Sequence, residues 1–417
     1  MVGVGSGYLL HVALARWMGP ASYGSYAYAM AWIGLLSMAT ALGLPVCSVR
    51  FVAQYRANGQ PALLRGTIRR FRQIVVIVGS LVAVLGTASA LMSSRLPSWL
   101  VIAAWLVPLS SFVNLNTEVA RGLGRAGLSQ VPDKILRPLW TVLGAALFFS
   151  VAGSLTINQA MMAALGALVA VALLQVGLLS RVLAQAPAAP KVEYRTREWL
   201  QVAVSLLAVS LFVLLASQID LLVAGFILDP AQIGIYSAAI RVASLIGFVP
   251  LSVNIVASPQ IAALYSQNET VRLQELAGRI AHMSFWPSLV LAAMVIALAS
   301  PILRLFGPEF AAARWALYIL TVCQLFKSGV GSVGYFLDMT GHQTHNARAF
   351  AMATLIGVLL NVAAIPWLGI VGAAAANLLL WVLVTLWLHK EVARLVGVRS
   401  SIVSAIRLQL HRRARGR

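Results

Sequence analysis

A few charged and polar residues lie inside stretches of the sequence that are otherwise apolar. Arg241 is far from either end of one such stretch, with Ser237 four residues before it and Ser244 three residues after it. This spacing places the three side chains on one face of a helix. A guanidinium beside hydroxyl groups can bind an anionic group such as a phosphate. The alternative is a structural ion pair, for which Asp220 in the preceding apolar stretch is the candidate partner.

Two further acidic or basic positions are deep in apolar stretches. Asp220, close to Ser217, either makes a helix-packing hydrogen bond or serves as a counter-charge or as a site for a proton or sodium ion. A stripe at spacings of three or four residues begins in the stretch 312–337 and ends just after it, made of Gln324, Lys327, Gly331, Gly334 and Asp338. Glycines allow close contact between helices, but Lys327 needs another explanation. It is the second candidate cation for an anionic ligand.

Charged residues near the ends of apolar stretches are harder to interpret. Glu118 and Arg121 either form a local ion pair near the membrane interface or provide a counter-charge or coupling-ion site. Arg16 and Arg50 either extend toward lipid head groups or bind ligand at the mouth of a cavity. A charged side chain at bilayer depth costs about 2.5–3.5 kcal/mol on insertion scales, so Arg241, which is far from either end of its stretch, should face something other than lipid.

Motifs for catalysis and cofactor binding are missing from the sequence. It has no phosphate-binding G-x-x-x-x-G-K-[ST] motif and no evident nucleophile–base arrangement. Cys47 and Cys323 lie in apolar stretches and favour core packing, and His342 and His345 are too few for a metal site. We therefore expect no enzyme activity, no cofactor and no metal.

The composition defines the elements that must position these residues. Of the 417 residues, 60% are hydrophobic and 10% are charged, and apolar runs of about 20 residues recur along the chain. This pattern predicts an all-α polytopic membrane protein without a sizeable soluble domain. The net charge of +20 is better explained by basic loops on one side of the membrane than by nucleic-acid binding.

Hydropathy predicts about twelve transmembrane helices. Their expected ranges are 2–17, 23–50 with a kink at Pro45, 73–92, 98–118, 138–151, 157–183, 199–227, 231–257, 282–303, 312–337, 349–367 and 369–388. Loops after the even-numbered helices, together with the tail, hold most of the 31 Lys and Arg residues, so this side and both termini should be cytoplasmic.

The two halves of the sequence show a weak internal repeat. A shift of 210 positions aligns Pro20, Gly24 and Tyr26 with Pro230, Gly234 and Tyr236. The segment 185–198, rich in Pro, Ala and charge, separates the halves. We therefore expect an N-terminal lobe at 1–184, a cytoplasmic linker at 185–198, a C-terminal lobe at 199–388 and a basic tail at 389–417. In the tail, Ile402, Ile406 and Leu410 share one face and favour a helix on the membrane surface.

Several stretches resemble one transporter family. They are ARWMGPASYGSYAYAMAW (15–32), GLPVCSVRFVAQY (43–55), the stretch 220–265, GHQTHNARAF (341–350) and NVAAIPWLGIVGAAAAN (361–377). Their order resembles the O-antigen and exopolysaccharide flippases of the multidrug/oligosaccharidyl-lipid/polysaccharide exporter superfamily. Family members usually carry a longer N-terminal leader, so either the chain starts late or its first helix is marginal.

The resemblance implies two six-helix lobes that form a V-shaped central cavity and alternate between inward-open and outward-open forms. It implies an oligosaccharide on undecaprenyl diphosphate as cargo, the bacterial inner membrane as location, and membrane lipids, a polymerase and chain-length proteins as partners. The candidate substrate-binding residues are then Arg241, Lys327, Arg16, Arg50, Ser237, Ser244 and Gln324. The alternatives are a cation-coupled multidrug antiporter, which would favour a more acidic cavity, a lipid II flippase, and a non-transporting scaffold for glycan synthesis.

Overall fold

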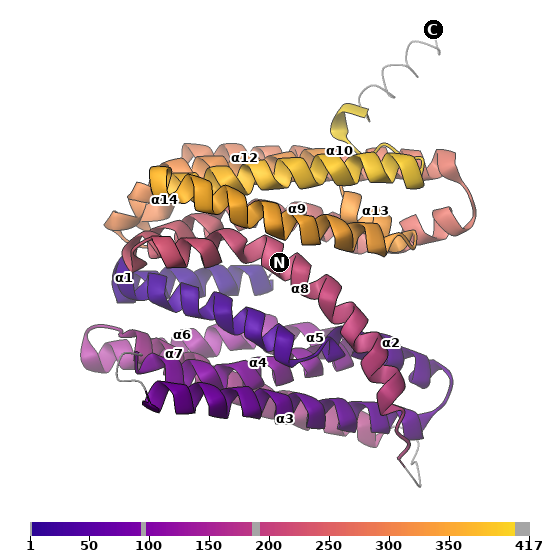
Figure 1. Ribbon diagram of the computed structural model, residues 1–417, viewed down its shortest axis with the longest axis horizontal. Coiled ribbons are helices and arrows are strands. Elements are labelled where there is room, and N and C mark those ends of the chain that lie inside the picture. Colours follow the sequence, from indigo (N-terminus) through magenta and orange to yellow (C-terminus); the bar gives the residue numbers. More distant parts are fainter. Residues whose placement is uncertain (1, 93–96, 186–191, 405–417) are drawn as a thin grey trace. The chain divides into compact units, whose positions relative to one another are not determined.

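The computed structural model describes residues 2–92, 97–185 and 192–404, and within these ranges the chain is helical and has no β-strand. The chain divides into two compact units, Met1–Leu214 and Leu215–Arg417 (Figure 1). Unit 1 contains α1 (Val2–Thr40), α2 (Leu44–Ala57), α3 (Pro61–Met92), α4 (Trp99–Gly122), α5 (Ala126–Val131), the π-helical turn η1 (Pro132–Leu136), α6 (Arg137–Ala152), α7 (Ile157–Ala184) and the first half of α8 (Thr196–Ile227). Unit 2 contains the rest of α8, then α9 (Pro230–Ser266), α10 (Thr270–Ala297), α11 (Ala299–Arg304), the 3-10 turn η2 (Pro308–Ala313), α12 (Arg314–Val330), α13 (Val333–Met339) and α14 (Gln343–Leu395).

Helix α1 consists of two segments that fold back at Gly19, whose φ of 72° is in the left-handed region that glycine favours. The Tyr23 hydroxyl lies 3.2 Å from His11 Nδ1. Twelve residues of straight helix would span about 18 Å, so the chain must reverse between these two residues. A second break follows at Leu42 and Gly43, both with positive φ, where α1 and α2 meet at 49°. The break thus precedes Pro45, at which the sequence predicts the kink.

The first half of α8 packs on unit 1. Trp199 is fully buried, donates a 3.0 Å hydrogen bond from Nε1 to the Tyr55 hydroxyl and meets Phe71 edge-on. Gly43 lies so close to α8 that a Cβ there would be 2.1 Å from the Ala203 carbonyl oxygen. The division at Leu214 therefore falls inside α8, downstream of the expected linker. The lobe boundaries inferred from the sequence remain a prediction.

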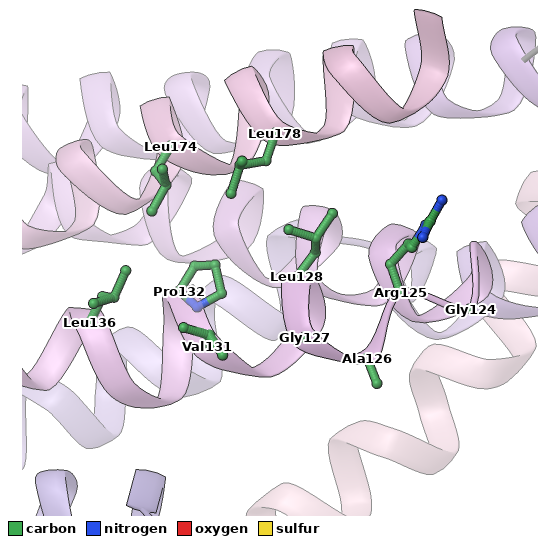
Figure 2. Close-up of a pocket in the computed structure, with 10 residues that line it drawn as sticks. All are labelled: Gly124, Arg125, Ala126, Gly127, Leu128, Val131, Pro132, Leu136, Leu174 and Leu178. Atoms are coloured by element: carbon green, nitrogen blue, oxygen red, sulfur yellow. The ribbon is translucent and has the colours of Figure 1, made fainter. Parts of the chain in front are cut away.

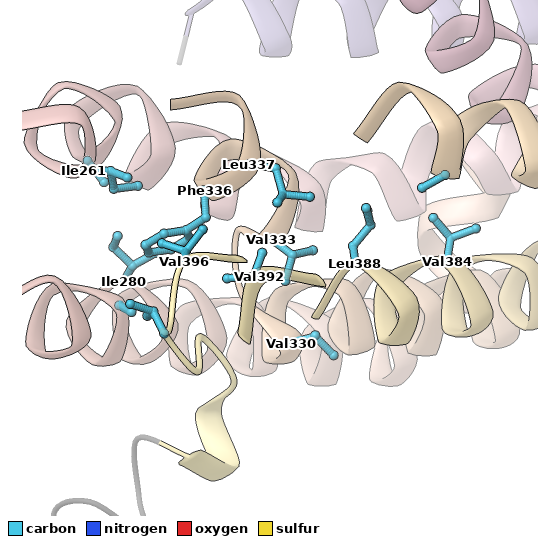
Figure 3. Packing of buried hydrophobic residues seen from close by; sticks show 14 of the residues in the cluster. Ile261, Ile280, Val330, Val333, Phe336, Leu337, Val384, Leu388, Val392 and Val396 are labelled. Atoms are coloured by element: carbon cyan, nitrogen blue, oxygen red, sulfur yellow. The ribbon is translucent and has the colours of Figure 1, made fainter. Parts of the chain in front are cut away.

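Unit 2 has a cluster of buried aliphatic residues around the Phe336 ring. Phe336 of α13 packs with Ile261 of α9, Ile280 of α10 and Val392 of α14 (Figure 3). Helix α14 folds back at Gly369 (φ 56°), so its two halves lie side by side. A Cβ at Gly357 in the first half would be 3.0 Å from Leu380 Cδ2 in the second half. The helices expected at 349–367 and 369–388 are these two halves.

In unit 2, Gly331 breaks the helix that carries Lys327. Helices α12 and α13 meet at 43° around Gly331, whose φ is 87°. The segment 396–404 after α14, here named the C-terminal strap, fills this break. Its Ser400 hydroxyl donates to the Val330 carbonyl at 3.2 Å, and a Cβ at Gly331 would be 2.3 Å from the Ser400 carbonyl oxygen. The polar stripe expected to continue along one helix face past Gly331 is therefore interrupted.

The membrane-protein fold predicted from the sequence is confirmed. Eight helices in the described ranges are long and apolar enough to cross a membrane, or ten if each bent pair is one span. Division of α1 and α14 at their glycines makes this arrangement compatible with twelve.

Several helix starts inferred from the sequence are too late. The helix expected at 138–151 already begins at Ala126, because α5 and η1 continue into α6, and the helix expected at 349–367 begins at Gln343. The basic stretch 61–72 belongs to α3 and the stretch 270–281 belongs to α10, because charged residues continue a helix beyond the bilayer. Of the surface helix expected in the tail, Ile402 is buried in unit 2 and the positions after 404 lie outside the described residues.

Candidate functional site

Arg241 lies half-buried in the first half of α9, about three turns after Pro230. Its guanidinium has no ion-pair or hydrogen-bond partner among residues 2–92, 97–185 and 192–404. Ser237, one turn earlier, is 2% exposed and its Oγ has no hydrogen-bond partner there either. Ser244 is exposed and donates a 2.7 Å hydrogen bond to the Arg241 carbonyl, which engages it with its own helix. The face of α9 predicted to bind an anion therefore offers one free cation.

Asp220 is buried at a junction of three helices. Its Oδ2 accepts hydrogen bonds from the Tyr236 hydroxyl of α9 at 2.6 Å and from Asn377 Nδ2 of α14 at 2.9 Å, and its Oδ1 accepts from the Leu221 amide at 2.9 Å. The structure thus gives Asp220 partners other than Arg241, and the ion pair considered between them is not formed. These contacts are those of a helix-packing residue. A role for Asp220 with a proton or sodium ion remains a prediction.

Lys327 of α12 is half-buried, and its Nζ lies 3.7 Å from the centroid of the Trp381 ring of α14. Gln324, one turn earlier, packs against α9, since its Nε2 is 3.3 Å from the position a Cβ would take on Gly247. Asp338, at the far end of the expected stripe, instead accepts a 2.9 Å hydrogen bond from Asn346 Nδ2. Lys327 therefore contacts an aromatic ring rather than a carboxylate.

The remaining candidates lie on unit 1. Glu118 and Arg121 form an ion pair at 2.8 Å within α4, which confirms the local pairing suggested by their spacing. Arg16 and Arg50 are both exposed. The Arg50 guanidinium lies 5.7 Å from the ring of its neighbour Phe51. Whether these two arginines contact a ligand remains a prediction.

The sequence did not single out a polar cluster in unit 1. Arg72, expected in a loop, lies in α3 and donates from Nε to Asn116 Oδ1 of α4 at 2.9 Å. Next to it, Gln175 of α7 donates to the Thr117 hydroxyl at 3.0 Å. The sequence also did not identify Tyr236, Asn377 and Trp381 of unit 2 as contacts of Asp220 and Lys327. The available signal was the asparagine and glutamine side chains inside apolar stretches, which must find partners when buried.

Unit 1 also contains a cavity of about 510 Å³ (Figure 2). Leu174 and Leu178 of α7 form one wall and Val131, Pro132 and Leu136 form another. Arg125 is its one charged lining residue. In the part of the chain that the structure describes, no three His, Cys, Asp or Glu residues are grouped to hold a metal ion.

The comparison with known families gives these features a context. The family model described as "Polysaccharide biosynthesis protein" matches residues 1–264. The chain belongs to the polysaccharide biosynthesis protein family. A second model, MatE, matches residues 205–367, so the two matches together cover most of this family member.

Part of the chain is also similar to curated proteins. The chain is 27% identical over 168 residues to the probable low-salt glycan biosynthesis flippase Agl15 of Haloferax volcanii, a match that covers 39% of this chain and 35% of that protein. The match thus spans about a third of the length of this curated relative.

Two solved structures share the fold at low identity. A multidrug resistance MATE family transporter of the MOP superfamily, in an inward-facing conformation, has a TM-score of 0.77 at 14% identity, over 95% of this chain and 96% of that chain. The lipid II flippase MurJ, in an inward closed conformation, has a TM-score of 0.70 at 16% identity, over 94% of this chain and 85% of that chain. This polysaccharide biosynthesis family member therefore has the fold of these transporters.

Proposed function

We propose that the protein is a flippase that moves a lipid-linked oligosaccharide from the cytoplasmic to the outer leaflet by alternating access. The observation that carries the proposal is the half-buried Arg241, a cation without a partner in the described ranges, in a member of the polysaccharide biosynthesis family. Lys327, which contacts a ring instead of a carboxylate, supports it. Both cations suit the diphosphate of an undecaprenyl diphosphate-linked glycan, and this cargo is part of the proposal.

Transfer of the proposed cargo across the bilayer requires a protein that shields its polar head group. A glycan head group cannot cross hydrocarbon unaided because its hydroxyl groups would lose their hydrogen bonds to water. A polar path through the protein would shield the sugars while the lipid tail stays in the bilayer. The proposed setting is the bacterial inner membrane, with both termini cytoplasmic and a polymerase and chain-length proteins of the same pathway as partners. The protein itself performs no catalytic step and uses no cofactor in this proposal.

Substitution of the two cations tests the site. In proteoliposomes that hold purified protein and lipid-linked oligosaccharide, Arg241→Gln and Lys327→Met should each lower the initial flipping rate at least tenfold. A hydrogen bond to a charged group contributes about 1.5–3 kcal/mol, and each 1.4 kcal/mol is a factor of ten. Arg272→Gln is the matched control, because Arg272 forms an exposed ion pair with Glu269 at 2.9 Å. Unchanged rates in both test variants would show that the site assignment is wrong.

A deletion strain tests the function itself. Loss of the protein should cause lipid-linked oligosaccharide to accumulate in the cytoplasmic leaflet and should abolish the surface polymer. An unchanged polymer without accumulation would contradict the flippase proposal. Flipping by the purified protein alone would exclude the scaffold alternative.

A cation-coupled multidrug antiporter is the second candidate, favoured by the MatE match over residues 205–367. Such a protein needs acidic groups that are accessible to a cationic drug. Asp220, the deeply buried acid of unit 2, already accepts three hydrogen bonds from protein donors. Efflux of ethidium from cells that express the protein, lost on Asp220→Asn, would favour this candidate over the flippase.

A further inference from the structure

Lys327, a cation in an otherwise apolar stretch, has an aromatic ring as its close contact. Lys327 Nζ lies 3.7 Å from the Trp381 ring centroid, within the range of a strong cation–π interaction. No carboxylate is within 4.0 Å of this nitrogen in the described parts of the chain. Phe350, from the first half of α14, meets the Trp381 ring edge-on at 6.0 Å between centroids. The tryptophan is thus positioned within its own helical hairpin, and the lysine lies against it.

Asp220, the buried acid of unit 2, already has other hydrogen-bond partners. Cys323 Sγ lies 3.5 Å from Asn377 Oδ1, and Asn377 in turn donates to Asp220. Lys327 and Trp381 each follow this pair by four residues, so they form the next contact along the same faces of α12 and α14. Lys327 thus lies one turn beyond the contact that leads to Asp220, and no ion pair forms between the two. The ammonium group is therefore held against the ring and has no carboxylate as a direct partner in the described parts of the chain.

A lysine that contacts an aromatic ring binds another anion more readily than a lysine that is paired with a carboxylate. A buried ion pair must be broken before the lysine can bind another anion, which leaves an uncompensated charge behind. A ring attracts the cation more weakly and covers one side of it. The ammonium has three N–H donors, so those that point away from the ring stay available for phosphate oxygens.

We propose that Trp381 is a positioning residue that holds Lys327 charged and oriented for the diphosphate of the cargo. This inference rests on the proposed function, since it assigns a partner to one of the two proposed diphosphate-binding cations. The ring stays under the ammonium while phosphate binds on the opposite side. Binding of a prenyl diphosphate should therefore depend on the electron density of the ring at position 381.

The test is the affinity of the purified full-length protein for farnesyl diphosphate, a prenyl diphosphate without sugar, measured by isothermal titration calorimetry. Lys327→Met and Trp381→Leu should each raise the Kd about tenfold, and Trp381→Phe, which keeps a ring, should raise it less than threefold. In the Lys327→Met background, Trp381→Leu should have no further effect. Trp315→Leu is the matched control, because Trp315 contacts Arg314 in another cation–π pair on α12 and is 61% exposed.

A second measurement keeps the shape of the side chain constant. Tryptophan analogues with one, two or three fluorine atoms, placed at position 381 by amber suppression, withdraw electrons from the ring without removing it. The Kd for farnesyl diphosphate should rise with each added fluorine, a trend that a purely structural role for Trp381 would not produce. This series also applies if Trp381→Leu fails to fold.

The outcomes separate the inference from the proposed function. If Lys327→Met weakens binding while the fluorine series and Trp381→Leu leave it unchanged or tighten it, the role of Trp381 is wrong and the diphosphate site stands. If wild type does not bind farnesyl diphosphate, or Lys327→Met binds it as wild type does, then the proposed diphosphate contact of Lys327 fails as well. A graded loss with fluorination, absent in Lys327→Met, supports the inference.

Discussion

Replacement of Tyr236 by phenylalanine tests the junction of three helices at Asp220. The Tyr236 hydroxyl donates a 2.6 Å hydrogen bond to Asp220 Oδ2, and both side chains are buried. A hydrogen bond to a charged group contributes about 1.5–3 kcal/mol. Because Asn377 still donates to the same oxygen, the carboxylate is not left without a partner. We therefore expect Tyr236→Phe to lower the free energy of unfolding by about 2 kcal/mol.

The assay is reversible unfolding in mixed micelles of dodecylmaltoside and dodecylsulfate, followed by far-UV circular dichroism. In an Asp220→Asn background the bond becomes a neutral one, and Tyr236→Phe should cost only about 1 kcal/mol. Tyr335→Phe is the matched control, since its hydroxyl makes no hydrogen bond within the described ranges, and it should change stability by less than about 0.5 kcal/mol. The reasoning is refuted if Tyr236→Phe costs no more than this control, or if its cost is the same with and without the Asp220 charge.

Two further substitutions test other contacts. Gly331→Ala should destabilise unit 2 by at least about 2 kcal/mol, because a Cβ at φ 87° would be 2.3 Å from the Ser400 carbonyl oxygen. It should also release the C-terminal strap and speed tryptic cleavage after Arg399, and a cleavage rate equal to wild type would count against the contact. Glu118→Gln, which removes the ion pair with the 52%-exposed Arg121, should cost less than about 1 kcal/mol in the same unfolding assay, so a larger loss would reveal a role beyond local pairing.

Hydropathy predicts the membrane-spanning regions well because the bilayer constrains composition strongly. The expected helix 157–183 corresponds almost residue for residue to α7 (Ile157–Ala184). The starts of α3 and α10 were missed because hydropathy reports where a helix enters the lipid. Both helices begin earlier, in polar segments outside the bilayer. The stretch 61–72 is basic yet helical, since Arg and Leu are both good helix formers.

The candidate site was predictable in its charges but not in its contacts. Arg241 and Lys327 stand out in the sequence because a charge in an apolar stretch is costly. Their surroundings depend on which helix faces which, and this is a tertiary property. Asp220 accepts a hydrogen bond from Asn377, and Lys327 contacts Trp381. In both pairs the two residues are more than fifty positions apart in the sequence. No local pattern in the sequence identifies either partner.

The C-terminal strap has a practical consequence for where the protein can be shortened or tagged. Its Val398 and Ser400 are almost fully buried, and Arg399 exchanges two 2.8 Å hydrogen bonds with Gln274 of α10. A truncation after Leu395 would leave the Val330 carbonyl without its hydroxyl partner, one turn from Lys327. Purification tags and reporter domains therefore belong after residue 404, where their attachment leaves the helix break closed.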